Sequence, residues 1–189
     1  MNSLDTIVLF RTEIFVTKID TSITDGVLEK IFEIQNSERS TIVSNVGGWQ
    51  SPSYSPNQQN FMSPIISEMK KHIGEIYNSM SVRGSGDIIN YWFNVNQKHD
   101  YNISHSHPGS YFSAVLYLKT PKNSGNIVFQ RPDNLRETIL FNTPNEHNFG
   151  DYQITPQKNM LVIFPSQLYH YVARNNSNKK RISISFNIK

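Results

Sequence analysis

Two stretches in the first half of the chain place apolar residues at the three-and-four spacing of a helix with one buried face. The first begins near Ser22 or Thr24, which are candidate N-caps, and the second spans Ser63 to Met80. Their apolar positions are Val27, Leu28, Ile31 and Phe32, and then Ile65, Ile66, Met69, Ile73, Ile76, Tyr77 and Met80. Before them, Thr6 to Lys18 alternates loosely and predicts a strand. Residues 36–60, rich in Gly, Pro and polar residues, predict a loop.

Beyond Gly84-Ser85-Gly86 the pattern changes to short β-branched and aromatic runs separated by turn residues. These runs predict strands at Ile88–Asn96, Tyr111–Lys119, Asn126–Gln130, Met160–Phe164 and Arg181–Ile188. Helices first and strands after favour an α+β, mainly β fold, with the helices packed on one face of a β-sandwich. The 189 residues fit one domain, with a strand and helices over 1–84 and a β core over 85–189.

One long segment interrupts this rhythm of strands. Residues 131–159 carry Pro and Gly and show no sustained apolar period, so they form either a functional lid or a surface insertion with a short hairpin. Its aromatic residues could close over a substrate, and these are Phe141, His147, Phe149 and Tyr152. Trp49 and Tyr54 in the early loop could do the same, although Trp49 could equally fill the helix layer.

Composition excludes several functional classes. Hydrophobic residues make up 37% of the chain and charged residues 17%, which is typical of a soluble globular domain. The absence of cysteine excludes disulfides, thiolate metal sites and a cysteine nucleophile. The net charge is +3, but the one dense basic cluster is Lys179-Lys180-Arg181, so we do not expect nucleic-acid binding. Without a signal-peptide pattern or a membrane span, we expect a cytoplasmic protein, of a cell or of an infected host.

The placement of histidines is the most informative chemical feature. His105 and His107 form an H-x-H pair, and residues two apart on an extended strand point to the same side, so both imidazoles can reach one point. His170 follows the apolar run Met160–Phe164, where a strand of the opposite sheet would deliver a third nitrogen. Three neutral donors with open positions opposite them make a catalytic metal site. An H-x-H pair alone can also be two surface histidines.

The last predicted strand carries a second candidate site. From residue 181 to 188, apolar residues alternate with Arg181, Ser183, Ser185 and Asn187, so one face is core and the other is polar. An arginine on an inward face needs an anion, because an unpaired buried charge is costly. A carboxylate would match the guanidinium fork, and Ser183 could donate a further hydrogen bond. Alternatively, Arg181 belongs to the exposed basic turn.

Taken together, these residues resemble a known family. His105-x-His107, His170 and then Arg181-x-Ser183 eleven residues later are similar in order and spacing to the iron(II)- and 2-oxoglutarate-dependent oxygenases. The chain resembles most a subgroup from marine bacteria and their phages. The motifs that carry this likeness are Leu9-Phe10, Gly48-Trp49-Gln50-Ser51, Asn102-x-x-His105-x-His107-Pro108-Gly109-Ser110, Phe164-Pro165-Ser166 through His170, and Arg181-Ile182-Ser183-Ile184-Ser185-Phe186-Asn187.

The resemblance implies a double-stranded β-helix (jelly roll) that uses Fe(II), 2-oxoglutarate and O2. It implies a hydroxylase that forms succinate and CO2 while it hydroxylates a substrate that the sequence does not identify. The implied residues are His105, His107 and His170 for the metal, Arg181 and Ser183 for the far carboxylate, and Asn94, Asn102 and Tyr117 as further contacts to the keto acid. The Asn-rich face of residues 88–96 could instead be a solvated outer face.

Two positions depart from the family pattern. Position 107 holds His where the superfamily has Asp or Glu, so either the site uses three histidines or the ligand lies elsewhere. Asp100 is the nearest preceding carboxylate, and its spacing does not suit the metal triad. Asn159 stands where subgroup members tend to have Gly, and Asn tolerates a left-handed backbone.

Two other functional classes stay open at this stage. A cupin-like enzyme would use the three histidines without a keto acid, although the Glu that cupins place about four residues after the pair is absent here. A non-enzymatic jelly-roll module would carry its histidines incidentally. A homodimer could form if an edge strand pairs with a second copy.

Overall fold

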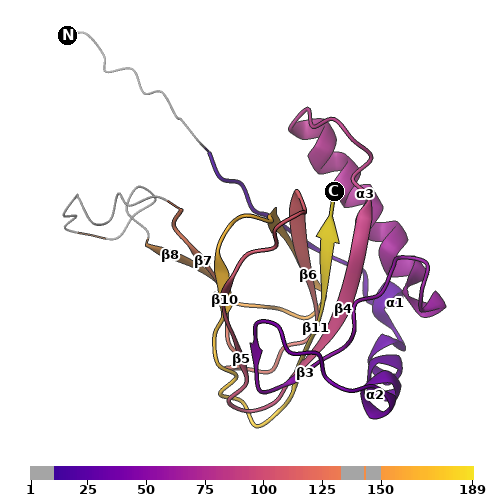
Figure 1. Ribbon diagram of the computed structural model, residues 1–189, viewed down its shortest axis with the longest axis vertical. Coiled ribbons are helices and arrows are strands. Elements are labelled where there is room, and N and C mark those ends of the chain that lie inside the picture. The colour runs from indigo at the N-terminus through magenta and orange to yellow at the C-terminus, as the bar shows by residue number, and fades with distance from the viewer. Residues whose placement is uncertain (1–10, 133–142, 144–149) are drawn as a thin grey trace.

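The computed structural model describes residues 11–132, 143 and 150–189, and it contains two antiparallel sheets with helices on the outer face of the larger one (Figure 1). The larger sheet has the strand order β1-β9-β6-β11-β4-β3, and the smaller has β2-β5-β10-β7-β8. The larger sheet comprises β1 (Phe15–Lys18), β3 (Trp49–Gln50), β4 (Ile88–Asn96), β6 (Phe112–Lys119), β9 (Met160–Pro165) and β11 (Arg181–Ile188). The smaller comprises β2 (Asn45–Val46), β5 (Tyr101–His105), β7 (Ile127–Gln130), β8 (Asp151–Ile154) and β10 (His170–Val172). The α+β, mainly β class is therefore confirmed.

The helices are α1 (Thr21–Thr24), α2 (Val27–Ser37), η1 (Asn60–Met62) and α3 (Ser63–Ser79). The first predicted helix is in fact two, and its expected caps were wrong. Asp20 caps α1 by accepting a 2.8 Å hydrogen bond from the Ser22 backbone N–H, and α2 starts after Gly26, whose φ of 74° interrupts the helical path. The short Asp20 side chain reaches the free N–H groups that begin a helix, so it serves better than Thr24, which lies inside the turn.

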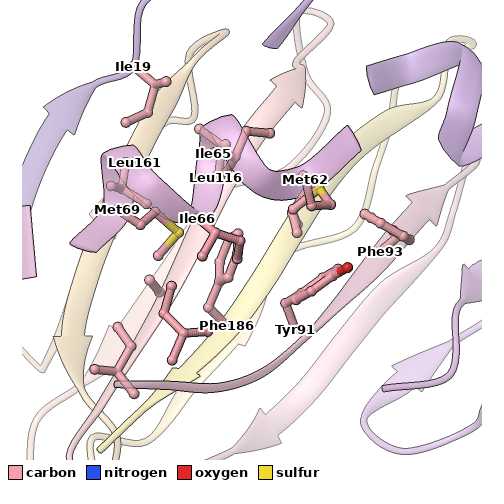
Figure 2. Close-up of a cluster of buried hydrophobic side chains, with 14 of the residues drawn as sticks. Ile19, Met62, Ile65, Ile66, Met69, Tyr91, Phe93, Leu116, Leu161 and Phe186 are labelled. Atoms are coloured by element: carbon pink, nitrogen blue, oxygen red, sulfur yellow. The ribbon is translucent and has the colours of Figure 1, made fainter. Parts of the chain in front are cut away.

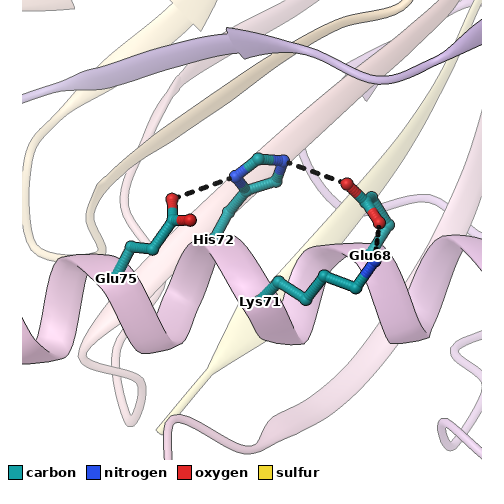
Figure 3. Close-up of polar contacts among 4 residues, drawn as sticks. All are labelled: Glu68, Lys71, His72 and Glu75. Atoms are coloured by element: carbon teal, nitrogen blue, oxygen red, sulfur yellow. Dashed lines mark hydrogen bonds and ion pairs between the residues drawn. The ribbon is translucent and has the colours of Figure 1, made fainter.

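The second helix agrees with its apolar stripe. The predicted positions from Ile65 to Tyr77 are buried, whereas Met80 lies beyond the helix and is 42% exposed. The opposite face of α3 is polar, with His72 between Glu68 and Glu75 and Lys71 bonded to Glu68 (Figure 3). Burial of one face drives the docking of this helix.

The larger sheet separates two apolar layers. Alternate residues of its strands face the helices, where Ile65, Ile66 and Met69 of α3 pack over Leu116, Leu161 and Phe186 (Figure 2). The intervening positions face the smaller sheet and pack with its side chains, among them Val115, Val162, Phe164 and Phe129. This two-sided burial explains why the strands β6 and β9 read as continuous apolar runs.

All five strands expected after residue 85 are present, with bounds that differ by a residue at most. The five predicted strands did not include β5 and β10, although His105 and His170 were expected on extended segments. The prediction missed β8, and it missed β2 and β3 in the segment read as loop. The first strand begins only at Phe15, and the part of its expected range before residue 11 lies outside the described residues. The missed strands are short and lack strong apolar alternation, because much of their surface lines a cavity or faces solvent.

No helix within the described part of the chain is long and apolar enough to cross a membrane. Most of the segment 131–159, including Phe141, His147 and Phe149, lies outside the described residues. Tyr152 lies on β8, and its side chain is 51% exposed.

Candidate metal and cofactor site

A cavity of about 390 Å³ lies between the two sheets. Its walls come from β4, β6 and β11 of the larger sheet, from β5, β7 and β10 of the smaller sheet, and from the segment 41–53. All eight residues expected to bind metal or keto acid line this one cavity, and they are Asn94, Asn102, His105, His107, Tyr117, His170, Arg181 and Ser183. The structure therefore brings together positions that span almost ninety residues of sequence.

The three histidines converge at one side of the cavity. One nitrogen from each of His105, His107 and His170 lies within 4.8 Å of the other two, which is close enough for a single ion to bind all three. His105 ends β5 and His170 begins β10, and these two residues are direct partners across the antiparallel pair. The strand pairing thus sets two of the histidines side by side, and His107 follows two residues later.

Hydrogen bonds orient two of these rings. The Nδ1 atom of His105 lies 2.8 Å from the carbonyl oxygen of Ile103, and that of His170 lies 2.9 Å from the carbonyl oxygen of Leu168. A carbonyl can only accept, so each Nδ1 carries the proton and each Nε2 has a free lone pair. A metal-binding histidine commonly uses this arrangement, in which the second nitrogen donates to a backbone carbonyl.

Burial keeps the three rings neutral at physiological pH. Burial, with a smaller contribution from the neighbouring imidazoles, lowers the pKa of His107 to about 4 and that of His170 to about 3. Burial also lowers the pKa of His105, against the effect of its bond to the Ile103 carbonyl. Three neutral imidazole lone pairs at one point form a donor set that suits a divalent first-row transition metal.

Arg181 lies at the deep end of the cavity, with a side chain that is 1% exposed. Its Nη1 donates to the carbonyl oxygen of Ser124 at 2.6 Å and also contacts those of Gly125 and Ala173, both at 3.4 Å. All three of these contacts come from Nη1, so the rest of the guanidinium forms no hydrogen bond with a described residue, and no described carboxylate forms an ion pair with Arg181. The alternative of an exposed basic turn is therefore wrong, and a buried cation faces the cavity.

Further hydrogen-bonding groups surround this cation. Asn94, Ser183 and Tyr117 are register neighbours across β4, β11 and β6, so their side chains lie in one row beside Arg181. The Ser183 and Tyr117 hydroxyls bond to no described residue. Burial raises the pKa of Tyr117 to about 12, although Arg181 opposes the shift, so this hydroxyl stays protonated and can donate. Hydroxyl groups that face the cavity without a protein partner can donate to the carboxylate of a bound acid.

Asn94 is 8% exposed and Asn96 is 3% exposed, so the polar face of β4 is a cavity wall and not a solvated outer face. The side-chain amide of Asn94 donates to the Ser185 hydroxyl at 3.0 Å. On β5, the Asn102 amide donates to the Ser44 hydroxyl at 3.0 Å, at the edge of the histidine cluster.

Ser44 and Gln50 line the cavity, although the sequence analysis gave Ser44 no role and named Gln50 only within the motif Gly48-Trp49-Gln50-Ser51. The Ser44 hydroxyl lies 3.4 Å from Nε2 of His105, the nitrogen that faces the cluster. No spacing or residue type indicates this contact, because it depends on the pairing of β2 with β5. Only the folded structure identifies these two residues.

Other candidates take structural positions. Asp100 is not near enough to join the histidine cluster, and its carboxylate accepts a 2.5 Å hydrogen bond from the Gln97 backbone. Trp49 and Tyr54 are buried in the helix layer and donate to the Glu38 carbonyl and carboxylate, respectively. Asn159 has a φ of 62°, in agreement with the left-handed backbone expected there.

Comparison with known proteins identifies the family of this chain. The family model described as "Putative 2OG-Fe(II) oxygenase" matches residues 90–187, which is just over half of the chain and includes all three histidines and Arg181. The chain belongs to the 2OG-Fe(II) oxygenases. This membership confirms the resemblance at the level of the family, the enzyme class and the use of Fe(II), 2-oxoglutarate and O2, and the subgroup from marine bacteria and phages stays a prediction. It decides against the cupin-like and non-enzymatic alternatives.

Solved structures of other oxygenases share the fold. A prolyl-4-hydroxylase from Pseudomonas putida is 14% identical, with a TM-score of 0.69 over 93% of this chain and 91% of that one. A viral collagen prolyl hydroxylase from Paramecium bursaria Chlorella virus-1 is 11% identical, with a TM-score of 0.62 over 93% and 94%. No curated protein matches the sequence. At these identities the likeness shows the fold alone, and it confirms the double-stranded β-helix of this 2OG-Fe(II) oxygenase.

Proposed function

We propose that this oxygenase is a hydroxylase in which His105, His107 and His170 hold Fe(II), and in which Arg181, Ser183 and Tyr117 bind the far carboxylate of 2-oxoglutarate. Asn94 and Asn102 are further contacts to the keto acid. The single observation that carries the proposal is the common cavity, which contains three neutral imidazole lone pairs at one side and a buried, unpaired guanidinium edge at the deep end.

The donor set supports iron at the three histidines even though position 107 lacks the usual carboxylate. His107 contributes the same type of neutral nitrogen as its two neighbours, and its Nε2 lies 3.4 Å from that of His170. A site without a carboxylate has one more positive charge, which a dianionic keto acid offsets when it binds. Within the described residues, no carboxylate joins the histidine cluster.

The metal, the keto acid and the protein side chains have different roles in the proposed reaction. When bound, Fe(II) with 2-oxoglutarate activates O2, so that a substrate C–H bond becomes C–OH while 2-oxoglutarate becomes succinate and CO2. The guanidinium and hydroxyl donors hold the keto acid, and the other polar groups of β11 and β4 line the same cavity. The groups around the guanidinium are buried, which limits bulk water at that end of the cavity, whereas His105 and His107 are half-buried.

Anaerobic titration of the Fe(II)-loaded protein with 2-oxoglutarate tests these assignments. We expect a weak visible charge-transfer band of the chelated keto acid. Arg181→Lys should raise the 2-oxoglutarate concentration at half-saturation about 10- to 100-fold, because lysine keeps the charge but loses the bidentate fork. Lys179→Ala is the matched control, since it removes a nearby exposed cation.

Three outcomes would contradict the proposal. Unchanged keto-acid affinity in Arg181→Lys and Arg181→Ala would remove Arg181 from the binding site. An equal loss in Lys179→Ala would mean that general electrostatic attraction causes the effect. His170→Ala that still binds one iron as tightly as wild type would remove the metal assignment.

Three finer expectations remain predictions. Residues 1–189 form a single oxygenase domain, with the strand and helices of 1–84 supporting the β core of 85–189. The cytoplasmic location and the homodimer through an edge strand are open to direct tests, namely cell fractionation and light scattering of the purified chain. The edge strands among the described residues are β1, β3, β2 and β8.

A further inference from the structure

His107 differs from the other two histidines in how its ring is held. Nδ1 of His105 and of His170 each lie within 3 Å of a backbone carbonyl, whereas Nδ1 of His107 bonds to no described residue. Its Nε2 is the atom that faces His170. A metal-binding histidine usually needs a second contact that fixes the rotation of the ring. At His107 that contact is not a hydrogen bond.

An aromatic contact takes its place. The Trp92 indole stacks on the His107 imidazole, with ring centroids 5.7 Å apart and planes inclined by 28°. Phe164 contacts the same imidazole edge-on, with centroids 6.5 Å apart. A stacked pair at this distance restricts rotation of the smaller ring, because rotation would lose the contact between the two faces.

The two residues differ in how firmly their backbones are held. Trp92 lies in the middle of β4, which pairs with β11 over its whole length, and it projects into the cavity with Asn94 and Asn96. His107 lies beyond the end of β5, and Gly109 follows with a φ of 89°. A backbone hydrogen bond from the His107 N–H to the Ser166 carbonyl, 2.8 Å long, anchors its main chain. The rigid strand therefore presents a fixed surface to a ring on a loop.

We infer that Trp92 is a positioning residue for the metal site and holds the His107 imidazole in its ligating orientation by stacking. It replaces the hydrogen bond that fixes each of the other two histidines, at the position where the superfamily has a carboxylate. The inference rests on the proposed role of His107 as a ligand. The Trp92 indole offers no lone pair to a metal, so its effect on the site passes through His107.

Titration of the metal-free protein with Co(II) measures this effect without turnover, through the visible absorption of the bound ion. Trp92→Ala should weaken Co(II) binding about 10- to 100-fold, the usual range for losing a group that orients a ligand. Trp92→Phe keeps an aromatic face and should restore most of the affinity. Trp49→Phe changes the other tryptophan, which is buried in the helix layer, and should leave Co(II) affinity unchanged.

A double-mutant cycle separates positioning from general damage. In the His107→Ala background, Trp92→Ala should cause no further loss of Co(II) affinity, because the ring that it orients is gone. Thermal unfolding of the metal-free variants verifies that each one is folded at the titration temperature.

The outcomes are distinguishable. Equal Co(II) affinity in wild type and Trp92→Ala overturns the inference and leaves the proposed function intact. A loss that persists in the His107→Ala background overturns it also, because Trp92 would then act by another route. If His107→Ala binds Co(II) like wild type, the proposed ligand set and this inference are both wrong.

Discussion

Acidification should destabilise the metal-free enzyme through its buried histidines. Folding lowers the pKa of His107 to about 4 and that of His170 to about 3, from about 6.5 in an unfolded chain. Because the unfolded state then binds more protons, the free energy of unfolding falls as the pH drops below about 6.5. The loss continues until the pH reaches the folded pKa values, and above pH 7 the contribution is negligible.

The magnitude at pH 5 depends little on the exact pKa values in the folded state. Both of them lie well below 5, so the folded rings remain largely neutral there. The unfolded state gains RT ln(1 + 10^(6.5 − 5)) from each protonated histidine, or about 2 kcal/mol. Two such rings reduce stability by about 4 kcal/mol, a large part of the 5–15 kcal/mol that is typical of a domain.

Urea denaturation at pH 7.5 and pH 5.0, on protein freed of metal by chelation, measures this loss. Between pH 7.5 and pH 5.0, the free energy of unfolding of His170→Gln should fall by about 2 kcal/mol less than that of wild type, because one titrating ring is gone. His72→Gln is the matched control, since its ring lies on the outer surface of α3 beside Glu68 and Glu75 and outside the cavity (Figure 3). An equal loss in wild type and His170→Gln, or the same reduction in His72→Gln, would refute the reasoning.

Two other predictions concern the backbone at Asn159 and the ligand at position 107. Asn159→Ala should destabilise the protein by about 2–4 kcal/mol in chemical denaturation, because alanine disfavours the φ of 62° and loses the bonds to the Thr24 and Thr21 hydroxyls. Asn159→Gly should lower the free energy of unfolding by about 1–2 kcal/mol less than Asn159→Ala does, because glycine adopts this φ without strain. Equal losses in the two variants would exclude backbone strain as a cause. His107→Asp should retain one bound iron by metal analysis, because aspartate supplies an oxygen ligand where the superfamily carries one. Loss of iron in this variant would show that the loop fits only imidazole.

The sequence by itself determined the elements whose surfaces are either uniformly buried or cleanly two-sided. The stripe of α3 and the alternation in β11 follow from the helical and strand periods, because one face of each packs in the core. In β11 the same alternation placed Arg181 and Ser183 opposite the core, and the H-x-H spacing placed two imidazoles on one side. These are local relations, so residue order alone is enough to state them.

Only the tertiary structure decided how these pieces meet. Pairing of β5 with β10 sets His105 beside His170, and pairing of β2 with β5 brings Ser44 to the same point. The short strands of the smaller sheet escape prediction because their side chains line a cavity or face solvent, which removes the apolar alternation that marks a strand. Stacking of Trp92 on His107 likewise depends on the tertiary structure, because β4 and β5 follow one another in the chain but belong to different sheets, and the facing of the two sheets is not written in the residue spacing.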